Sequence, residues 1–523
     1  MRFRTVMLWT CLWLMAGVAG CAPASSPAPA LSSGKADRQP PFEVAATAQG
    51  TAGEEQAADI PPEAGGTANP NNQALPLMYF EDYGVNPFID ADEDAFSTFA
   101  LDGDTASYAL GRRYFRDGWL PPPESVRIEE YVNAFEGGFA AAANGLSLHL
   151  DAAPAPFALE GYILLRVGVA APAFPDEREP VTLIFIVDVS GSMGADNRLE
   201  AAKRIMLGLL DQAHSADKAA LVIFSSRAMV LESLTNMEDP VDLKRTIRRL
   251  RTSGSTYAEA GLRLAYELAA DEMLRGQRVR LVLFSDGVGN VGETGPDQIL
   301  ELVDQHAQRQ ATLTTVGVGI GGNYNDVMME RLANRGNGTY HYIEDRDAEE
   351  AFLAGPAVAV FHETARDARV QIEFNPETVR KYRLLGYENR AKDDESFRDD
   401  TEDFGEIGFR SNVTALYEVR PLGEVPEGLM ATARLRYRDV LQSAIVELQT
   451  DINWDAVQEP NRYFQRQAAV AEWAELLGKS FYAQCGSIEA VLAVLPAAWD
   501  EAGQELEQLI RLSEPVFEPF CET

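Results

Sequence analysis

The chain has 523 residues, a length typical of three or four domains. Its 80 Asp and Glu residues outnumber its 45 Lys and Arg residues, which gives a formal net charge of −35. A surface this acidic repels phosphate backbones and argues against nucleic acid as a partner. Four cysteines and five histidines are too few for a zinc-finger array or a disulfide-dense scaffold.

The N-terminus has the features of a secretion signal. Arg2 and Arg4 precede the mostly apolar stretch 6–18, which is too short for a comfortable membrane span. It ends in Val18-Ala19-Gly20-Cys21, which resembles the lipobox of bacterial lipoproteins. The resemblance implies cleavage before Cys21 and lipidation of that cysteine. We therefore expect attachment to the cell envelope through lipid alone, at the outer membrane where there are two membranes. An ordinary signal peptide with a chance cysteine is the alternative.

Residues 21–76 are expected to be a flexible tether. Between Ala22 and Leu75, Ala, Gly, Pro and Ser supply 31 of 54 residues, and Phe42 is the only aromatic residue. Such a stretch cannot bury enough apolar surface to offset the entropy of ordering it. As a coil it would span about 40 Å and hold the folded part away from the membrane.

Ordered patterning begins near Leu77 and changes character twice along the chain. Before residue 170 it predicts helices at 105–115 and 123–135 and strands at 146–150 and 162–169. From 181 to 361 strands and helices alternate. The expected strands are 181–187, 219–224, 279–284, 311–318 and 340–343, and the expected helices are 199–210, 243–250, 257–274, 296–308, 325–334 and 348–361. This alternation predicts a doubly wound parallel sheet of the α/β class.

Beyond residue 365 the hydrophobic period changes to two. Strands are expected at 369–374, 382–387, 414–419, 433–437 and 443–448, followed by helices at 463–477, 488–495 and 502–512. The strands predict an antiparallel β-sandwich that the strands before residue 170 would complete, so that the parallel domain is inserted in or flanked by the sandwich. The expected domains are a signal peptide (1–20), a tether (21–76), an N-terminal helical flanking domain (77–140), the sandwich (141–180 and 365–455), the parallel domain (181–364) and a C-terminal helical region (456–523).

Hydroxyl and carboxylate side chains gather where the predicted parallel strands end. Asp188, Ser190 and Ser192 follow the first buried strand, Thr256 precedes a helix, and Asp286 follows another buried strand. Ligands bind beyond the carboxyl ends of strands in open parallel sheets, and oxygen ligands select Mg²⁺, Ca²⁺ or Mn²⁺. Asp-x-Ser-x-Ser alone would more often be ordinary turn chemistry. The whole set predicts a divalent-cation site.

This five-residue set resembles the metal-ion-dependent adhesion site of the von Willebrand factor type A family, over residues 181–361. The resemblance implies that Asp188, Ser190, Ser192, Thr256 and Asp286 bind Mg²⁺ (or Ca²⁺ or Mn²⁺). It also implies that an acidic side chain of a protein partner fills the open coordination position and that the chain is not an enzyme. Segments flanking this domain, such as Asn86-Pro87-Phe88 and Leu385-Gly386-Tyr387, resemble the flanks of a bacterial subgroup of the family.

Other interpretations of the chain stay open. A structural or assembly lipoprotein whose metal only stabilises the fold is the main alternative, and a metal-dependent hydrolase is a weaker one because no nucleophile or general base accompanies the site. The stretches 287–292 and 317–322 fit Gly-x-Gly-x-x-Gly, but tight turns beside the metal loop explain them better than a dinucleotide site. An oxidising compartment would favour a disulfide between Cys485 and Cys521, with two free thiols as the alternative.

Overall fold

The computed structural model describes the folded part of the chain. The described residues are 80, 82–101, 103–172, 178–287, 300–303, 311–319, 326–399, 404–408, 411–423, 426–440, 442 and 444–521. The signal peptide, Cys21 and the tether, all expected within residues 1–76, lie outside them. Most of the helix expected at 296–308 also lies outside, although residues 300–303 are helical.

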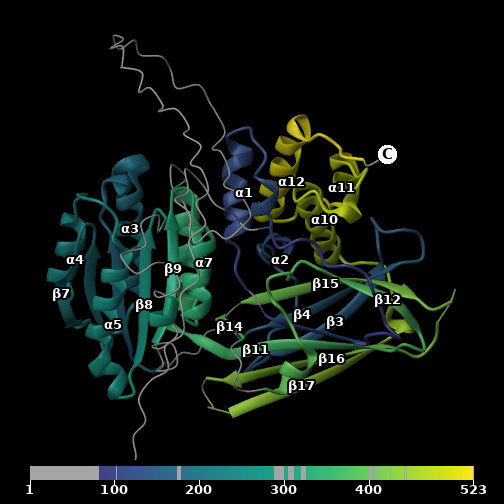
Figure 1. Cartoon of the computed structure of the whole chain (residues 1–523), viewed down its shortest axis with the longest axis horizontal. Helices are drawn as coiled ribbons and strands as arrows, with labels where there is room; N and C mark the ends of the chain where they lie inside the picture. The colour runs from purple at the N-terminus through teal and green to yellow at the C-terminus, as the bar shows by residue number, and fades with distance from the viewer. Residues whose placement is uncertain are drawn as a thin grey trace, which may run out of the picture. The chain divides into compact units, whose positions relative to one another are not determined.

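A six-stranded sheet forms the centre of the α/β domain (Figure 1). Its order is β10 (Tyr340–Ile343), β9 (Ala311–Val318), β8 (Arg278–Ser285), β5 (Val181–Asp188), β6 (Lys218–Phe224) and β7 (Ala228–Asn236). The strands from β10 to β6 pair in parallel. The prediction of a doubly wound α/β sheet is confirmed.

The edge strand β7 was not predicted, and it makes the sheet mixed rather than wholly parallel. It pairs antiparallel with β6. Only residues 225–227 separate the two strands, and so short a connection allows only an antiparallel return.

Helices cover both faces of this sheet because its strands are apolar on both faces. Alternate residues of β5 join two different cores: Leu183 and Phe185 contribute to one, and Ile184 and Ile186 to the other. The first core contains α3 (Arg198–Gln212), α4 (Val241–Arg249), α8 (Arg346–Ala354) and α9 (Ala357–Phe361), and the second contains α5 (Ala258–Leu274) and α7 (Asp326–Arg335). The single helix expected at 348–361 is in fact two helices, α8 and α9. The break occurs because Pro356 lacks an amide hydrogen and disfavours the helical conformation at Gly355.

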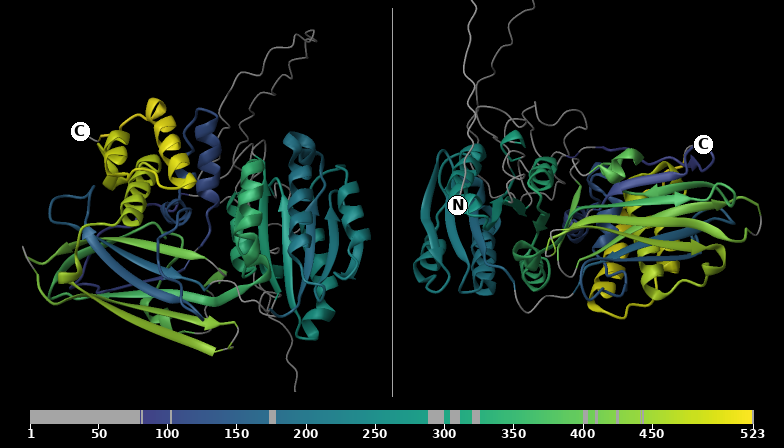
Figure 2. Two further views of the ribbon diagram at one scale, coloured as in Figure 1. Left: turned by 180° about the vertical axis from the view of Figure 1, so that it is seen from behind. Right: turned by 90° about the horizontal axis from the view of Figure 1, so that it is seen from below.

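A β-sandwich is built from strands that precede and follow the α/β domain in the sequence, and it lies beside that domain (Figure 2). One sheet has the order β1 (Ile89–Asp90), β12 (Val379–Leu385), β15 (Asn412–Pro421), β4 (Ile163–Ala170) and β3 (Ser147–Pro154). The other has the order β13 (Ala391–Lys392), β2 (Phe96–Ala100), β11 (Glu363–Phe374), β16 (Leu429–Asp439) and β17 (Ala444–Asn453), and β14 (Gly405–Gly408) also pairs with β11. The α/β domain is inserted between β4 and β11. The short strands β1 and β2 lie in the segment for which only helices were expected.

Helices from both ends of the chain cover the first sheet of the sandwich. They are α1 (Ala106–Arg116), α2 (Ile128–Asn133), α10 (Arg462–Leu477), α11 (Ile488–Val494) and α12 (Glu501–Ser513). Trp473 of α10 is fully buried in one cluster with Leu164 and Leu416 of the sheet, and its indole N–H donates to Ser513 Oγ at 3.1 Å. Within the described residues, no helix is long and apolar enough to cross a membrane.

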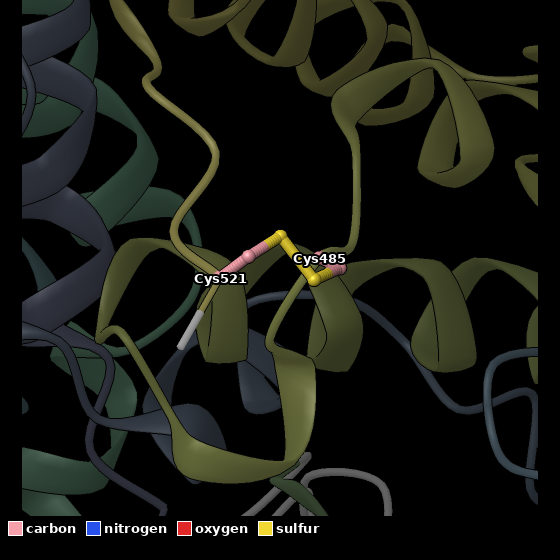
Figure 3. The surroundings of a disulfide bond; sticks show 2 residues. All are labelled: Cys485 and Cys521. Atoms are coloured by element: carbon pink, nitrogen blue, oxygen red, sulfur yellow. A yellow bond between two sulfur atoms is a disulfide. The ribbon is translucent and has the colours of Figure 1, made fainter. Parts of the chain in front are cut away.

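A disulfide and two ion pairs hold the helical layer together and join it to the α/β domain. The structure joins Cys485, which follows α10, to Cys521 near the C-terminus by a disulfide (Figure 3). Arg112 of α1 pairs with Glu344, directly after β10, at 2.7 Å and with Glu505 of α12 at 2.6 Å. The α/β domain is thus linked through α1 to the C-terminal helices.

Candidate metal centre

Three loops meet at the carboxyl edge of the α/β sheet. Asp188 is the last residue of β5, and Ser285 is the last residue of β8. The two strands are parallel neighbours, with Val187 opposite Phe284, so both strands end at the same level. Asp286 therefore begins its loop beside Asp188, as the predicted topology required.

Hydrogen bonds connect four of the five predicted ligands. Asp188 Oδ1 accepts from the Ser190 N–H at 2.8 Å, and the hydroxyl oxygens of Ser190 and Ser192 are 3.0 Å apart. The Ser192 hydroxyl donates to Asp286 Oδ1 at 3.1 Å. Asp188 is also held by Ser285, whose hydroxyl donates to Asp188 Oδ2 at 3.0 Å. The carboxylates and hydroxyls are thus within one connected group.

The loop carrying Thr256 is attached to this group through its backbone. The Gly191 N–H donates to the Gly254 carbonyl at 3.0 Å, and the Ser253 N–H donates to the Val189 carbonyl at 2.6 Å. Gly254 has φ +80°, a left-handed conformation that glycine adopts without strain. Thr256 is half-buried two residues later, and within the described residues its hydroxyl forms no hydrogen bond to the other four side chains.

Burial differs across the site. Asp188, Ser190 and Asp286 are 0%, 1% and 5% exposed, whereas Ser192 is exposed. Burial raises the pKa of Asp188 to about 6, and the negative charge of Asp286 adds to the rise, while the hydrogen bonds from Ser190 and Ser285 oppose it. Two buried carboxylates this close favour the uptake of a positive charge.

Arg198, the first residue of α3, supplies part of that charge. Its guanidinium donates to Asp286 Oδ2 at 2.7 Å, and both side chains are 5% exposed. Neither Arg198 nor Ser285 was predicted from the sequence to belong to the site. Ser285 adjoins Asp286 in the sequence, but the pairing of Arg198 with a residue 88 positions away gave no sequence signal.

The side chains present fit a hard divalent cation. Within the described residues, no group of three or more His, Cys, Asp or Glu side chains could hold a metal ion, so a cation here has to draw on hydroxyls as well. The group offers carboxylates and hydroxyls without sulfur or imidazole, which is the donor set of Mg²⁺, Ca²⁺ or Mn²⁺. Because Arg198 holds Asp286 Oδ2, Asp286 Oδ1 is the oxygen that faces the serine hydroxyls.

Three family models match different parts of the chain. A family model described as von Willebrand factor type A domain matches residues 183–288, and one described as von Willebrand factor matches residues 76–165. A model described as the C-terminal part of the uncharacterized protein YfbK matches residues 359–515.

Individual relatives agree with the family models. YfbK of Escherichia coli (strain K12) is 32% identical over 433 residues, which are 77% of this chain and 74% of that protein. An uncharacterized protein of Synechocystis is 30% identical over 185 residues, 35% of this chain and 42% of its own length. A solved structure, von Willebrand factor type A from Catenulispora acidiphila, aligns with a TM-score of 0.45 and 16% identity over 71% of this chain and 91% of that one.

Proposed function

Because the chain belongs to the YfbK family of bacterial von Willebrand factor type A domain proteins, we propose that it is a non-enzymatic, cation-dependent binding module. Asp188, Ser190, Ser192, Thr256 and Asp286 would hold Mg²⁺, or Ca²⁺ or Mn²⁺. The cation would supply a coordination position for an acidic side chain of a protein partner. Type A domains commonly mediate protein interactions, which supports this class of function.

The observation that carries the proposal is the connected group of four predicted ligands. Asp188, Ser190, Ser192 and Asp286 come from two loops 98 residues apart yet share hydrogen bonds at one sheet edge. Exposed Ser192 leaves the group open to solvent, so a bound cation could reach a partner there. Hydroxyl ligands add no negative charge and leave the cation able to attract an outside carboxylate.

We propose further that the protein acts at the cell envelope, held by lipid on Cys21. The proposal is supported by the apolar segment and the Val18-Ala19-Gly20-Cys21 sequence. The tether of 56 residues between the lipid and the fold would let the binding module reach partners away from the membrane surface.

Titration calorimetry of the full chain with Mg²⁺ tests the metal centre. We expect Mg²⁺ to bind the wild type, and Asp188→Ala and Thr256→Ala to weaken binding by at least about tenfold, since each removes a ligand. Ser253→Ala is the matched control, because it removes an exposed hydroxyl from the same loop.

Capture of crosslinked partners from cells, in Mg²⁺ or EDTA, then tests the function. Capture that survives EDTA and Asp188→Ala would refute it.

A second candidate is a structural lipoprotein whose cation only stabilises the fold. It is favoured by the way Asp188 joins the ends of β5 and β8 through Ser285. This candidate expects Mg²⁺ to raise the melting temperature of the wild type while Asp188→Ala leaves partner capture intact. The same two variants and the same capture experiment therefore separate the candidates.

A further inference from the structure

A cationic segment adjoins the candidate metal centre in this acidic protein. Residues 243–257 contain five Lys and Arg side chains and no acidic residue, in a chain with a net charge of −35. The segment covers most of α4 and the loop that leads to Thr256. The inference that follows rests on the proposed function and names the chemistry of the partner.

Four arginines of this region are exposed. They are Arg248 and Arg249 in the last turn of α4, Arg251 after it, and Arg227 in the turn between β6 and β7. Within the described residues none of the four forms an ion pair, whereas their neighbours Lys244 and Arg245 pair with Asp211 and Asp242. We call the four residues the arginine rim.

Backbone and side-chain contacts place two residues of the rim, Arg251 and Arg227, next to the metal loops. Arg251 is two residues before Ser253, whose N–H donates to the Val189 carbonyl at 2.6 Å. Arg227 follows Ser226, whose hydroxyl oxygen is 3.1 Å from Ser255 Oγ. α4 itself is fixed because Leu243 and Ile247 are fully buried, which leaves Arg248 and Arg249 on its exposed side.

We propose that the arginine rim is the second half of the partner-binding surface and that the partner presents an acidic segment with several carboxylates. One carboxylate coordinates the cation, and its neighbours in the partner pair with the rim. Arginine suits this task because its planar guanidinium can hold a carboxylate with two hydrogen bonds. Among the described residues, no ion pair of the rim has to be broken first.

Long-range electrostatics also favour an acidic partner at this site. A net charge of −35 repels an acidic partner from most directions. The arginine rim, which forms no ion pair within the part of the chain that the structure describes, would attract the partner toward the face that holds the candidate metal centre. Such attraction raises the association rate more than the affinity. The rim therefore explains how an acidic protein could recruit an acidic ligand.

The test uses fluorescence anisotropy with the full chain and a short synthetic peptide rich in Asp and Glu, with its Asn and Gln counterpart as the uncharged probe. Arg248→Gln, Arg249→Gln and Arg251→Gln are combined in a rim variant. Arg380→Gln, Arg420→Gln and Arg462→Gln, three exposed positions outside the α/β domain, give a control with the same change in charge. Binding is measured in Mg²⁺ and in EDTA from about 0.05 to 0.5 M NaCl.

We expect the rim variant to bind the acidic peptide about tenfold more weakly at low salt, with a flatter salt dependence, while the control and the affinity for Mg²⁺ alone stay unchanged. Equal binding by the rim variant and the wild type would overturn the inference and leave the proposed function standing. Peptide binding that survives EDTA and Asp188→Ala would overturn the proposed function and the two-part binding mode with it. Phosphatidylglycerol vesicles that bind through the rim when the peptide does not would show that the rim serves a membrane instead.

Discussion

Replacing Arg198 by Met offers a sharp test of the site's electrostatics. The substitution keeps much of the apolar length of the side chain and removes the guanidinium that bonds to Asp286 Oδ2 at 2.7 Å. The side chains of Arg198 and Asp286 are both 5% exposed. In the variant, the Asp286 carboxylate therefore stays buried near the Asp188 carboxylate and has lost the positive charge of the guanidinium.

Breaking a buried ion pair on one side costs about 3–5 kcal/mol, because the remaining charge is uncompensated. One kcal/mol shifts the melting temperature of a domain this large by about 2–4 °C, so we expect a decrease of about 6–20 °C in EDTA. A cation at about a hundred times its dissociation constant adds about 2.7 kcal/mol of stability. Since the unpaired carboxylate would bind it more tightly, Mg²⁺ should stabilise the variant more than the wild type.

Thermal unfolding followed by circular dichroism, in EDTA and in excess Mg²⁺, measures both effects. Arg113→Met is the matched control, because the Arg113 and Asp117 side chains are 44% and 47% exposed and such a pair contributes less than about 1 kcal/mol. Two results would refute this account of the site. One is an equal melting temperature for Arg198→Met and the wild type in EDTA, and the other is an increase on adding Mg²⁺ that is no larger for the variant than for the wild type.

Three further predictions concern the anchor, the disulfide and the half-buried carboxyl group of Glu472. Radiolabelled palmitate should enter the wild type and not Cys21→Ser; label in both would exclude lipidation at this residue. Non-reducing mass mapping should recover Cys485 joined to Cys521, and Cys521→Ser should lower the free energy of unfolding by up to about 4 kcal/mol, given their separation of 36 residues; two alkylatable thiols would contradict this. Burial, aided by the charges of Glu475 and Glu418, raises the pKa of Glu472 to about 8. The contribution of Glu472 to stability falls as pH rises from about 4.5 to 8, because the folded protein favours the protonated carboxyl group. In urea titrations, Glu472→Gln should therefore be more stable than the wild type by on the order of 2 kcal/mol at pH 8 and equally stable at pH 4. A difference in stability that does not depend on pH would refute the assignment.

The positions of the predicted ligands could be foreseen in part, because the topology of the sheet brings the ends of two strands together. Asp188 and Asp286 directly follow buried apolar strands, and parallel neighbours end at one edge, so their approach was predictable from the two strands alone. Arg198 was missed because an arginine at the start of a helix is ordinarily a solvated residue. Its burial against Asp286 depends on packing between α3 and the end of β8, which no local pattern records.

The fold was predictable where segments are long and strongly periodic. The eight residues of β5 are buried on both faces, and that pattern has few alternatives. The two-residue strand β1 and the edge strand β7, in contrast, have weak or partial burial, and only their neighbours decide that they are strands. Pro356 in the sequence did indicate the break between α8 and α9. The break was missed because apolar residues continue on both sides of the proline and favoured a single helix.

The amino-acid sequence by itself determined the parallel strands of the α/β sheet, the long strands of the sandwich and the hydroxyl and carboxylate residues proposed for the site, because each depends on local hydrophobic period or on which residue ends a strand. Only the tertiary structure decided that Arg198 partners Asp286, that Arg227 lies next to the loop that leads to Thr256, and that α1 links the α/β domain to α12. These contacts join residues tens to hundreds of positions apart. Charge pairing at such separations is set by how whole elements pack, and no pattern along the chain contains it.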